Sequence, residues 1–290
     1  MSKRNPVYDF KWCPGCGDFG VKRAIEGALV ERCATHNEPI EQTVIVAGIG
    51  CSGNLVHLQE GPQPFGIHGI HGRTLPISYG IKSARPDVNV LVVSGDGDFL
   101  SIGAEHIGPQ AKRNLDITAV VMDNGVYGLT KGQASPTTEF EVVTSTTPYG
   151  KLDDKMRPLE TYLAAGVGFI ATAMSSQVKE LQQLILEAMD YPGFSIVHVQ
   201  SPCTTYNDTY ALLKGNPKEG IEPAAHPIPD SHDPSDFDAA MALARGKGIP
   251  MGVLYRRPES IPAHERLRIA RERSGVRSQS VDELLSAMTI

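Results

Sequence analysis

The chain has 290 residues, of which 41% are apolar and 21% charged, a composition typical of a globular protein. Its formal net charge of -6 gives no electrostatic reason to expect a nucleic acid or an anionic membrane as partner. The N-terminus lacks the apolar core of a signal peptide, and no apolar run approaches the about 20 residues of a membrane span, so we expect a cytoplasmic protein.

Short runs rich in valine and isoleucine predict buried strands at residues 43–49, 88–94, 116–122 and 194–200. Apolar residues recur at helical spacing between them, in residues 21–29 and again in residues 178–188, where Ser175 is the expected N-cap. This alternation predicts an α/β fold in which helices cover both faces of a parallel sheet.

Proline changes the character of the C-terminal part of the chain. Five prolines within residues 216–234 predict an extended connector, because proline disrupts both helices and central strands. Two short helices are expected beyond it, at residues 236–245 after Ser235 and at residues 281–288 after Ser280. We therefore predict a main domain over residues 1–210 and a C-terminal extension over residues 211–290 that packs on a partner chain.

A glycine-flanked carboxylate, Gly95-Asp96-Gly97, follows the second predicted strand. Glycines allow the backbone to approach a ligand closely, and the N-terminus of the helical segment that follows is a natural seat for phosphate. Asp96 is then placed to hold Mg²⁺, which usually shares its oxygen ligands with a phosphate. The third predicted strand ends in Asp123-Asn124, and parallel strands deliver their carboxyl ends to one edge. Either motif alone is more typical of a surface turn, but together they predict one crevice.

Four of the five cysteines are expected at the same edge. Cys13 and Cys16 form a CxxC motif, whereas Cys51 and Cys203 each follow a predicted strand. Four such thiolates bind a [4Fe–4S] cluster, although structural zinc also takes four, usually as two close pairs. A thioredoxin-like dithiol would use the CxxC pair alone, and spacing leaves these alternatives open. Cys33 has no companion and is expected to pack inside a helix.

The paired polar motifs resemble the fingerprint of thiamine diphosphate enzymes. That fingerprint opens with Gly-Asp-Gly and closes, one strand later, with an Asn that usually follows another Asn. Asp123 takes the preceding place here, which leaves the metal-ligand position intact. The resemblance assigns Mg²⁺ to Asp96, Asn124 and the Val126 carbonyl. It places the diphosphate near Gly97, Asp98, Gly128 and Leu129.

A longer set of motifs resembles the β subunit of 2-oxoacid:ferredoxin oxidoreductases. The set is Trp12-Cys13-Pro14-Gly15-Cys16-Gly17, Gly50-Cys51-Ser52-Gly53, the thiamine diphosphate motif and Pro202-Cys203. The resemblance implies the pyrophosphate-type domain of the thiamine-diphosphate-binding fold. It also implies one [4Fe–4S] cluster held by Cys13, Cys16, Cys51 and Cys203. The implied reaction is oxidative decarboxylation of a 2-oxoacid to an acyl-coenzyme A and CO₂, with electrons passed to an external ferredoxin, or the reverse carboxylation.

Partners and further site residues also follow from the resemblance. The carboxylate that activates the aminopyrimidine belongs to another domain, so an obligate α subunit is expected, in an αβ heterodimer or its dimer. Residues 129–137 resemble the 2-oxoglutarate-type and broad-range members, so 2-oxoglutarate is favoured over pyruvate. The expected cofactor contacts include Ile49, Gly50, Cys51, Ser52 and His68; the expected catalytic residues are His68, His71 and Lys131.

Ordinary alternatives stay open at this point. Solvated turn histidines and a surface lysine would explain His68, His71 and Lys131 equally simply. Two other functions also fit parts of the pattern: a non-redox thiamine diphosphate decarboxylase or synthase, and a zinc-stabilised interaction subunit. The first would lack iron and sulfide, and the second would hold zinc and no thiamine diphosphate.

Overall fold

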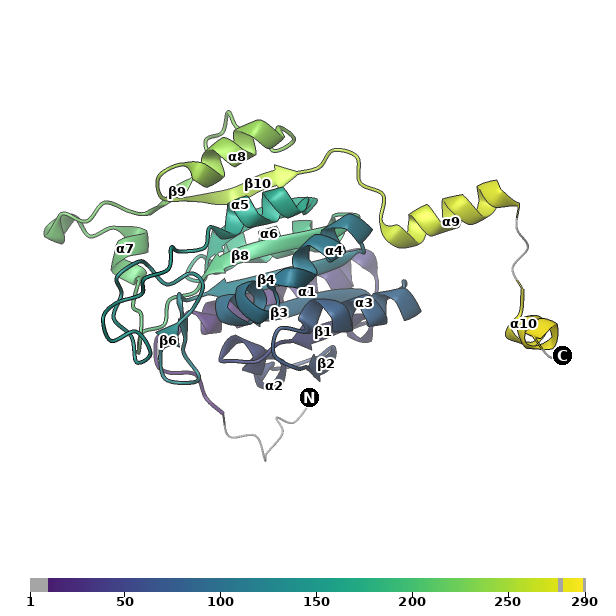
Figure 1. Ribbon diagram of the computed structural model, residues 1–290, viewed down its shortest axis with the longest axis horizontal. Coiled ribbons are helices and arrows are strands. Elements are labelled where there is room, and N and C mark those ends of the chain that lie inside the picture. The colour runs from purple at the N-terminus through teal and green to yellow at the C-terminus, as the bar shows by residue number, and fades with distance from the viewer. Residues whose placement is uncertain (1–9, 276–278, 289–290) are drawn as a thin grey trace.

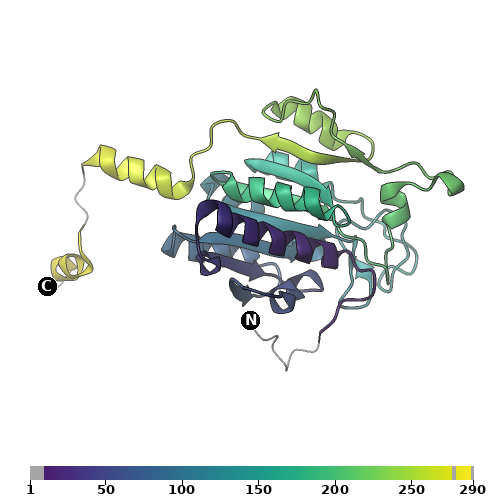
Figure 2. The same ribbon diagram turned by 180° about the vertical axis from the view of Figure 1, so that it is seen from behind.

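One sheet of eight strands forms the centre of the protein. The computed structural model describes residues 10–275 and 279–288. The strand order is β2-β1-β3-β4-β8-β7-β10-β9, and all neighbours are parallel except the antiparallel pair of β10 and β7. Helices cover both faces of this sheet, as Figures 1 and 2 show from opposite sides. The predicted α/β class is therefore confirmed.

The predicted strands all exist, with boundaries shifted by no more than two residues. The large sheet contains β1 (Thr43–Ala47), β2 (Phe65–His68), β3 (Asn89–Gly95), β4 (Ile117–Asp123), β7 (Phe169–Met174), β8 (Phe194–Gln200), β9 (Ala225–Pro227) and β10 (Ile249–Arg256). A small antiparallel pair is formed by β5 (Val126–Tyr127) and β6 (Gln133–Ala134). The four predicted strands are β1, β3, β4 and β8, the interior of the parallel part.

The helices divide between the two faces of the sheet. Their bounds are α1 (Asp18–His36), α2 (Leu55–Leu58), α3 (Thr74–Ala84), α4 (Ile107–Arg113), α5 (Pro158–Ala165), α6 (Val178–Asp190), α7 (Tyr210–Lys214), α8 (Phe237–Arg245), α9 (Ala263–Ser274) and α10 (Val281–Met288). One buried cluster joins α1 and α6 to the sheet, and a second joins α3, α4, α5 and α8 to the opposite face. Among the described residues, no helix combines the length and apolar character needed to cross a membrane.

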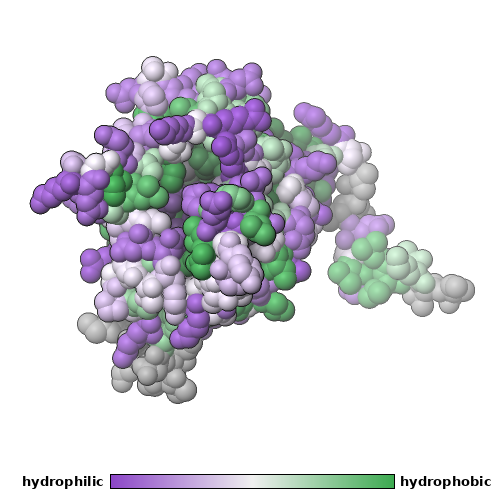
Figure 3. Space-filling view, turned by 60° about the vertical axis from the view of Figure 1, so that its left-hand side comes forward, coloured by the Kyte–Doolittle hydropathy of each residue, from purple (hydrophilic) through white to green (hydrophobic). Residues whose placement is uncertain are grey.

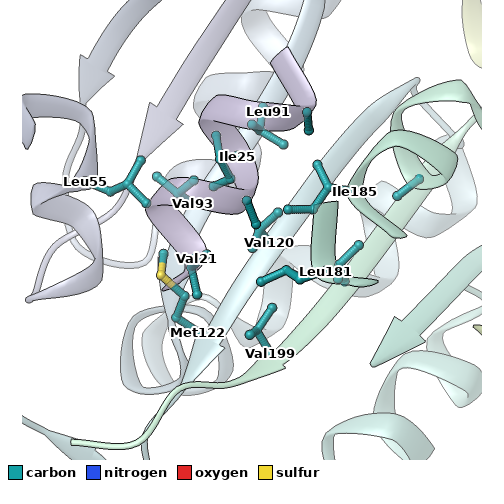
Figure 4. Close-up of a cluster of buried hydrophobic side chains, with 14 of the residues drawn as sticks. Val21, Ile25, Leu55, Leu91, Val93, Val120, Met122, Leu181, Ile185 and Val199 are labelled. Atoms are coloured by element: carbon teal, nitrogen blue, oxygen red, sulfur yellow. The ribbon is translucent and has the colours of Figure 1, made fainter. Parts of the chain in front are cut away.

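The cluster beneath α1 and α6 supports the strands that carry the polar motifs. Ile25 of α1 and Leu181 of α6 are fully buried and face Val93 and Val120 of the sheet (Figure 4). Apolar side chains at helical spacing produced this interface, as the sequence predicted. Because β3 and β4 are held from this side, the loops that follow them start from fixed positions.

The residues that cap the helix N-termini differ in part from those predicted. The expected N-cap Ser175 is wrong, because α6 begins at Val178 after Gln177 and has no side-chain cap. The helix predicted at residues 236–245 begins one residue later, and Asp236 caps it by accepting hydrogen bonds from the backbone of the first turn. At α10, Ser280 and Glu283 exchange side-chain-to-backbone hydrogen bonds, a capping box.

The C-terminal part of the chain divides into two pieces. β9 and β10 complete the large sheet, so the extended connector expected at residues 216–234 contains an edge strand. Beyond β10, α9 and α10 project from the body, and Val281 and Met288 of α10 are more than two-thirds exposed at 71% and 79% (Figures 1 and 3). The packing of residues 211–290 on a partner stays a prediction. The outer ends of the two expected units, residues 1–9 and 289–290, lie outside the described residues.

We predict that Leu181→Ala destabilises the protein by about 2–5 kcal/mol, because it removes a fully buried side chain and leaves a cavity between α6 and the sheet. Denaturant unfolding of the purified protein measures this loss. Leu267→Ala on α9 is the matched control, since that side chain is 51% exposed. Equal losses for the two variants would contradict this account of the core.

Candidate functional site

A pocket of about 280 Å³ lies at the carboxyl ends of β1, β3 and β4. Twelve of the residues expected at the site line it: Ile49, Gly50, Cys51, Ser52, His71, Asp96, Gly97, Asp98, Asn124, Val126, Gly128 and Leu129. Gly95, Tyr127 and Thr130 complete the lining. The two polar motifs and the Cys51 segment therefore meet at one edge of the sheet, as their positions after parallel strands require.

Asp96 is buried at the base of this pocket. Its carboxylate accepts hydrogen bonds from the Thr137 hydroxyl at 2.7 Å and from the Asn124 backbone N–H at 3.4 Å. Burial, together with the charge of Asp123, raises the pKa of Asp96 to about 7. An ionised Asp96 is unfavourable here without a cation beside it, so the environment fits a metal ligand.

The loop after β4 is fixed by its own polar groups. Asn124 Oδ1 accepts a hydrogen bond from the Val126 N–H at 3.0 Å, and its backbone carbonyl accepts one from Asn207 Nδ2 at 2.8 Å. The Tyr127 hydroxyl donates to the Gly97 carbonyl at 3.0 Å, which ties this loop to the loop after β3. Asp96, Asn124 and Val126 are thus brought to one place, where oxygen ligands for a hard cation are available.

Asp98 organises the opposite wall of the pocket. One carboxylate oxygen accepts hydrogen bonds from the backbone N–H groups of Ile49 at 3.1 Å and Gly72 at 2.8 Å, and from His71 Nδ1 at 2.6 Å. The other oxygen accepts a hydrogen bond from the Ser94 hydroxyl. The carboxylate is therefore saturated by the protein itself. Its contribution is to hold the imidazole of His71 and two loops around the cavity.

The remaining predicted residues lie outside the pocket wall. His68 Nδ1 lies 2.8 Å from His57 Nε2, and its own buried Nε2 has no hydrogen-bond partner. Lys131 is exposed in the turn after the pocket residues Leu129 and Thr130, with a left-handed φ of 86°. The structure thus brings His71 into the wall, whereas His68 lies beside Gly53, next to the wall residue Ser52, and Lys131 lies in an exposed turn.

The four cysteines singled out from the sequence gather beside the pocket. A Cβ built on Gly128 would lie 3.7 Å from the Cys51 sulfur and 3.8 Å from the Cys203 sulfur. Burial and the neighbouring charges of Asp18, Cys203 and Cys13 raise the pKa of Cys51 to about 12. The pKa of Cys16 is likewise raised far above its usual range by burial and by the negative charges of Asp18, Cys51 and Cys203. The four thiols are therefore electrostatic neighbours.

Four neighbouring thiols are a candidate metal centre. In the part of the chain that the structure describes, no three potential ligands converge on a single ion position. Four thiolates can ligate either a zinc ion or an iron–sulfur cluster. A four-iron cluster itself occupies the space between its ligands. Gly128 leaves that space free of a side chain, whereas Cys33 lies apart within α1.

Comparison with known proteins decides the family. Residues 48–199 match the family "thiamine pyrophosphate enzyme, C-terminal TPP binding domain", and residues 203–272 match the family for the C-terminal part of the pyruvate ferredoxin oxidoreductase β chain. The chain is 39% identical to the β subunit of 2-oxoacid:ferredoxin oxidoreductase 1 of Aeropyrum pernix, an alignment that covers 88% of this chain and 80% of the relative. This chain belongs to the 2-oxoacid:ferredoxin oxidoreductase β subunits.

Two further relatives carry 2-oxoglutarate in their names. A 2-oxoglutarate synthase subunit KorB of Archaeoglobus fulgidus is 37% identical over 67% of this chain and 70% of its own length. A solved structure of 2-oxoglutarate:ferredoxin oxidoreductase from Magnetococcus marinus, with 2-oxoglutarate, coenzyme A and succinyl-CoA bound, superposes with a TM-score of 0.86. It is 35% identical, and the match covers 98% of this chain and 94% of the other.

The site of this β subunit includes residues that sequence reasoning missed. Thr137 bonds Asp96 from 41 positions away, and its hydroxyl also lies 2.7 Å from Asp123. His198 on β8 contacts Asp123 at 3.1 Å, and this contact lowers the pKa of Asp123 against the effect of burial. Neither Thr137 nor His198 stands in a sequence motif, so nothing in the sequence indicated that either belongs to the site. Tyr127 was detectable in principle, because it stands inside the Asn124 motif.

We predict that Asp98→Asn lowers the stability of this β subunit by about 1–3 kcal/mol, because the buried hydrogen bonds from the Ile49 and Gly72 N–H groups to a charged oxygen become weaker neutral ones. A thermal melt of the protein measures the change. Glu180→Gln on the exposed surface of α6 makes the same chemical change as a control, and it should leave the melting temperature nearly unchanged. An unchanged Asp98→Asn melting temperature would show that these hydrogen bonds do not organise the wall.

Proposed function

We propose that this β subunit holds the catalytic centre for the coenzyme A-dependent oxidative decarboxylation of a 2-oxoacid to an acyl-CoA and CO₂, with the electrons passed to ferredoxin. The reverse direction is reductive carboxylation. One observation supports this most directly: Cys51 lines the same pocket as Asp96 and Asn124. A metal-held cofactor and a thiolate-held redox centre would thus be neighbours.

Thiamine diphosphate and Mg²⁺ fit the pocket. Asp96, Asn124 and the Val126 carbonyl would hold the metal ion, which supplies the positive charge that the buried Asp96 otherwise lacks. Gly97 and Gly128 present backbone without side chains to the diphosphate. When bound, thiamine diphosphate supplies the carbanion chemistry that releases CO₂ from a 2-oxoacid. The protein contributes placement and a fixed environment.

A [4Fe–4S] cluster fits the four cysteines. Cys13, Cys16, Cys51 and Cys203 would ligate it, and the Gly128 backbone leaves the gap between two of the sulfurs open. When bound, such a cluster accepts and passes on single electrons. The Cys203 segment is joined to the metal-site loop through Asn207, which donates to the carbonyls of both Cys203 and Asn124. This link holds the two centres at a fixed separation.

We propose roles for three polar side chains in or near the pocket. His71, oriented by Asp98, would exchange a proton at its Nε2 with a group in the pocket. His68 would support the loop through His57 rather than touch the cofactor directly. Lys131 would pair with a substrate carboxylate, since it follows the pocket residues Leu129 and Thr130 in a tight turn.

The proposed partners follow from the family to which the chain belongs. The relatives are named as β subunits, so we propose an α subunit that completes the cofactor site, in an αβ heterodimer or its dimer. We favour 2-oxoglutarate as substrate because relatives at 37% and 35% identity carry that name, with pyruvate as the alternative. Coenzyme A and ferredoxin are the other proposed partners, and the cytoplasm is the expected location.

The deciding experiment is anaerobic purification of the chain with its α subunit. We expect iron, sulfide and thiamine diphosphate in the preparation, together with reduction of a viologen dye that requires both a 2-oxoacid and coenzyme A. A faster reaction with 2-oxoglutarate than with pyruvate would support the favoured substrate. Thiamine diphosphate without iron would instead indicate a non-redox decarboxylase or synthase. Zinc without thiamine diphosphate would indicate an interaction subunit.

We predict that Asp96→Ala abolishes dye reduction, because the metal-held cofactor loses its buried carboxylate ligand. Thiamine diphosphate content, measured after gel filtration, should fall together with activity. Asp116→Asn is the control, because Asp116 precedes β4 at the opposite edge of the sheet and pairs with Lys82. Full activity in Asp96→Ala would refute the assignment.

We also predict that Cys203→Ala lowers iron and sulfide content and electron transfer together, since one cluster ligand is lost. Cys33→Ala provides a matched control, because Cys33 lies within α1 and away from the other four cysteines. Iron analysis and the dye assay on the two variants test the ligand set. Equal iron content in both would exclude Cys203 from it.

A further inference from the structure

A buried carboxylate, Asp18, lies near Cys16 and Cys51 and is not part of the pocket lining. It occupies the first turn of α1, two positions after Cys16, and is only 1% exposed. A carboxylate in such a place is costly unless its oxygens are hydrogen-bonded, so its contacts are informative.

Each oxygen of Asp18 bonds a serine in a different cysteine-bearing segment. The Ser201 hydroxyl donates to Oδ1 at 2.6 Å, and the Ser52 hydroxyl donates to Oδ2 at 3.2 Å. Ser52 directly follows Cys51, and Ser201 lies two positions before Cys203. Both serines are themselves buried. One side chain therefore joins the three segments that supply all four thiols.

Other hydrogen bonds join these segments in pairs. The Gly17 N–H donates to the Pro202 carbonyl at 3.0 Å, and Trp12 Nε1 donates to the Cys51 carbonyl at 2.8 Å. Neither contact connects the Cys51 segment with the Cys203 segment. Asp18 does so, because one of its oxygens accepts a hydrogen bond from Ser201 and the other accepts one from Ser52.

We propose that Asp18 is the positioning residue of the iron–sulfur site, which holds the three cysteine-bearing segments in register and sets the charge beside the sulfurs. This inference rests on the proposed function, since it requires that the four cysteines bind a cluster. Outer contacts of this kind typically change metal affinity by roughly 10- to 100-fold when they are removed. Nearby charge and hydrogen bonds also set the reduction potential of an iron–sulfur cluster.

Two substitutions separate the positioning effect from the charge effect. Asp18→Ala removes both hydrogen bonds, so we expect iron and sulfide per chain to fall well below the wild-type values. Asp18→Asn retains the shape and can bond both serine hydroxyls, since a hydroxyl accepts as well as donates. We therefore expect Asp18→Asn to restore cluster content and to raise the cluster's midpoint potential through loss of the negative charge.

The measurements use the anaerobically purified αβ enzyme. Iron and sulfide analysis gives cluster content, and a redox titration at alkaline pH, followed by electron paramagnetic resonance, gives the midpoint potential. Asp116→Asn, at the far edge of the sheet, is the control for loss of an acidic charge and should leave both quantities unchanged. Ser52→Ala combined with Ser201→Ala removes the hydrogen bonds while keeping the carboxylate, and should lower cluster content as Asp18→Ala does.

The outcomes distinguish this inference from the proposed function. A wild-type enzyme without iron would refute the proposed function itself. A wild-type enzyme with a full cluster, combined with wild-type cluster content in Asp18→Ala or an unchanged potential in Asp18→Asn, would overturn the inference alone. Should Asp18→Ala fail to fold, the potential of Asp18→Asn and the cluster content of the double serine variant still decide it.

Discussion

The shared direction of four neighbouring strands is the constraint on which the site depends. Because β1, β3, β4 and β8 are parallel, the loops that follow them all leave the sheet at one edge. Each of these loops contributes one functional segment: Cys51, Asp96, Asn124 and Cys203. Residues that are far apart in sequence thus become neighbours without any special long-range pairing, as is usual for ligand sites in open parallel sheets.

Buried carboxylates near this edge are stabilised in different ways, and the differences suggest their tasks. Asp98 accepts four hydrogen bonds and serves the walls of the pocket. Asp123 is stabilised by His198, whereas Asp96 lacks such a partner and is suited to a cation. Asp18 is shared between two serines. An aspartate thus supports the pocket wall, suits a metal ion or connects two segments, depending on the hydrogen-bond donors nearest to it.

Much of this arrangement could be predicted from the sequence, and the failures have physical causes. The interior strands were found because burial on both faces requires unbroken valine and isoleucine runs. β7 is rich in alanine and threonine, and β10 contains Pro250 and Gly252, so neither gives that signal. Twelve pocket residues were named from short motifs together with the family resemblance that these motifs carry. Thr137, His198 and Asp18 were not assigned roles, because their partners lie in other segments and only the fold brings them together.

The antiparallel pairing of β10 with β7 has a consequence for truncated chains. β7 lies inside the sheet only because a strand from residues 249–256 covers its outer edge. A chain that ended at residue 210 would leave the backbone groups of residues 169–172 of this buried strand without their partner strand. Such an edge is a template for intermolecular strand pairing. Residues 249–256 therefore cover a strand edge that would otherwise be open to pairing with another chain.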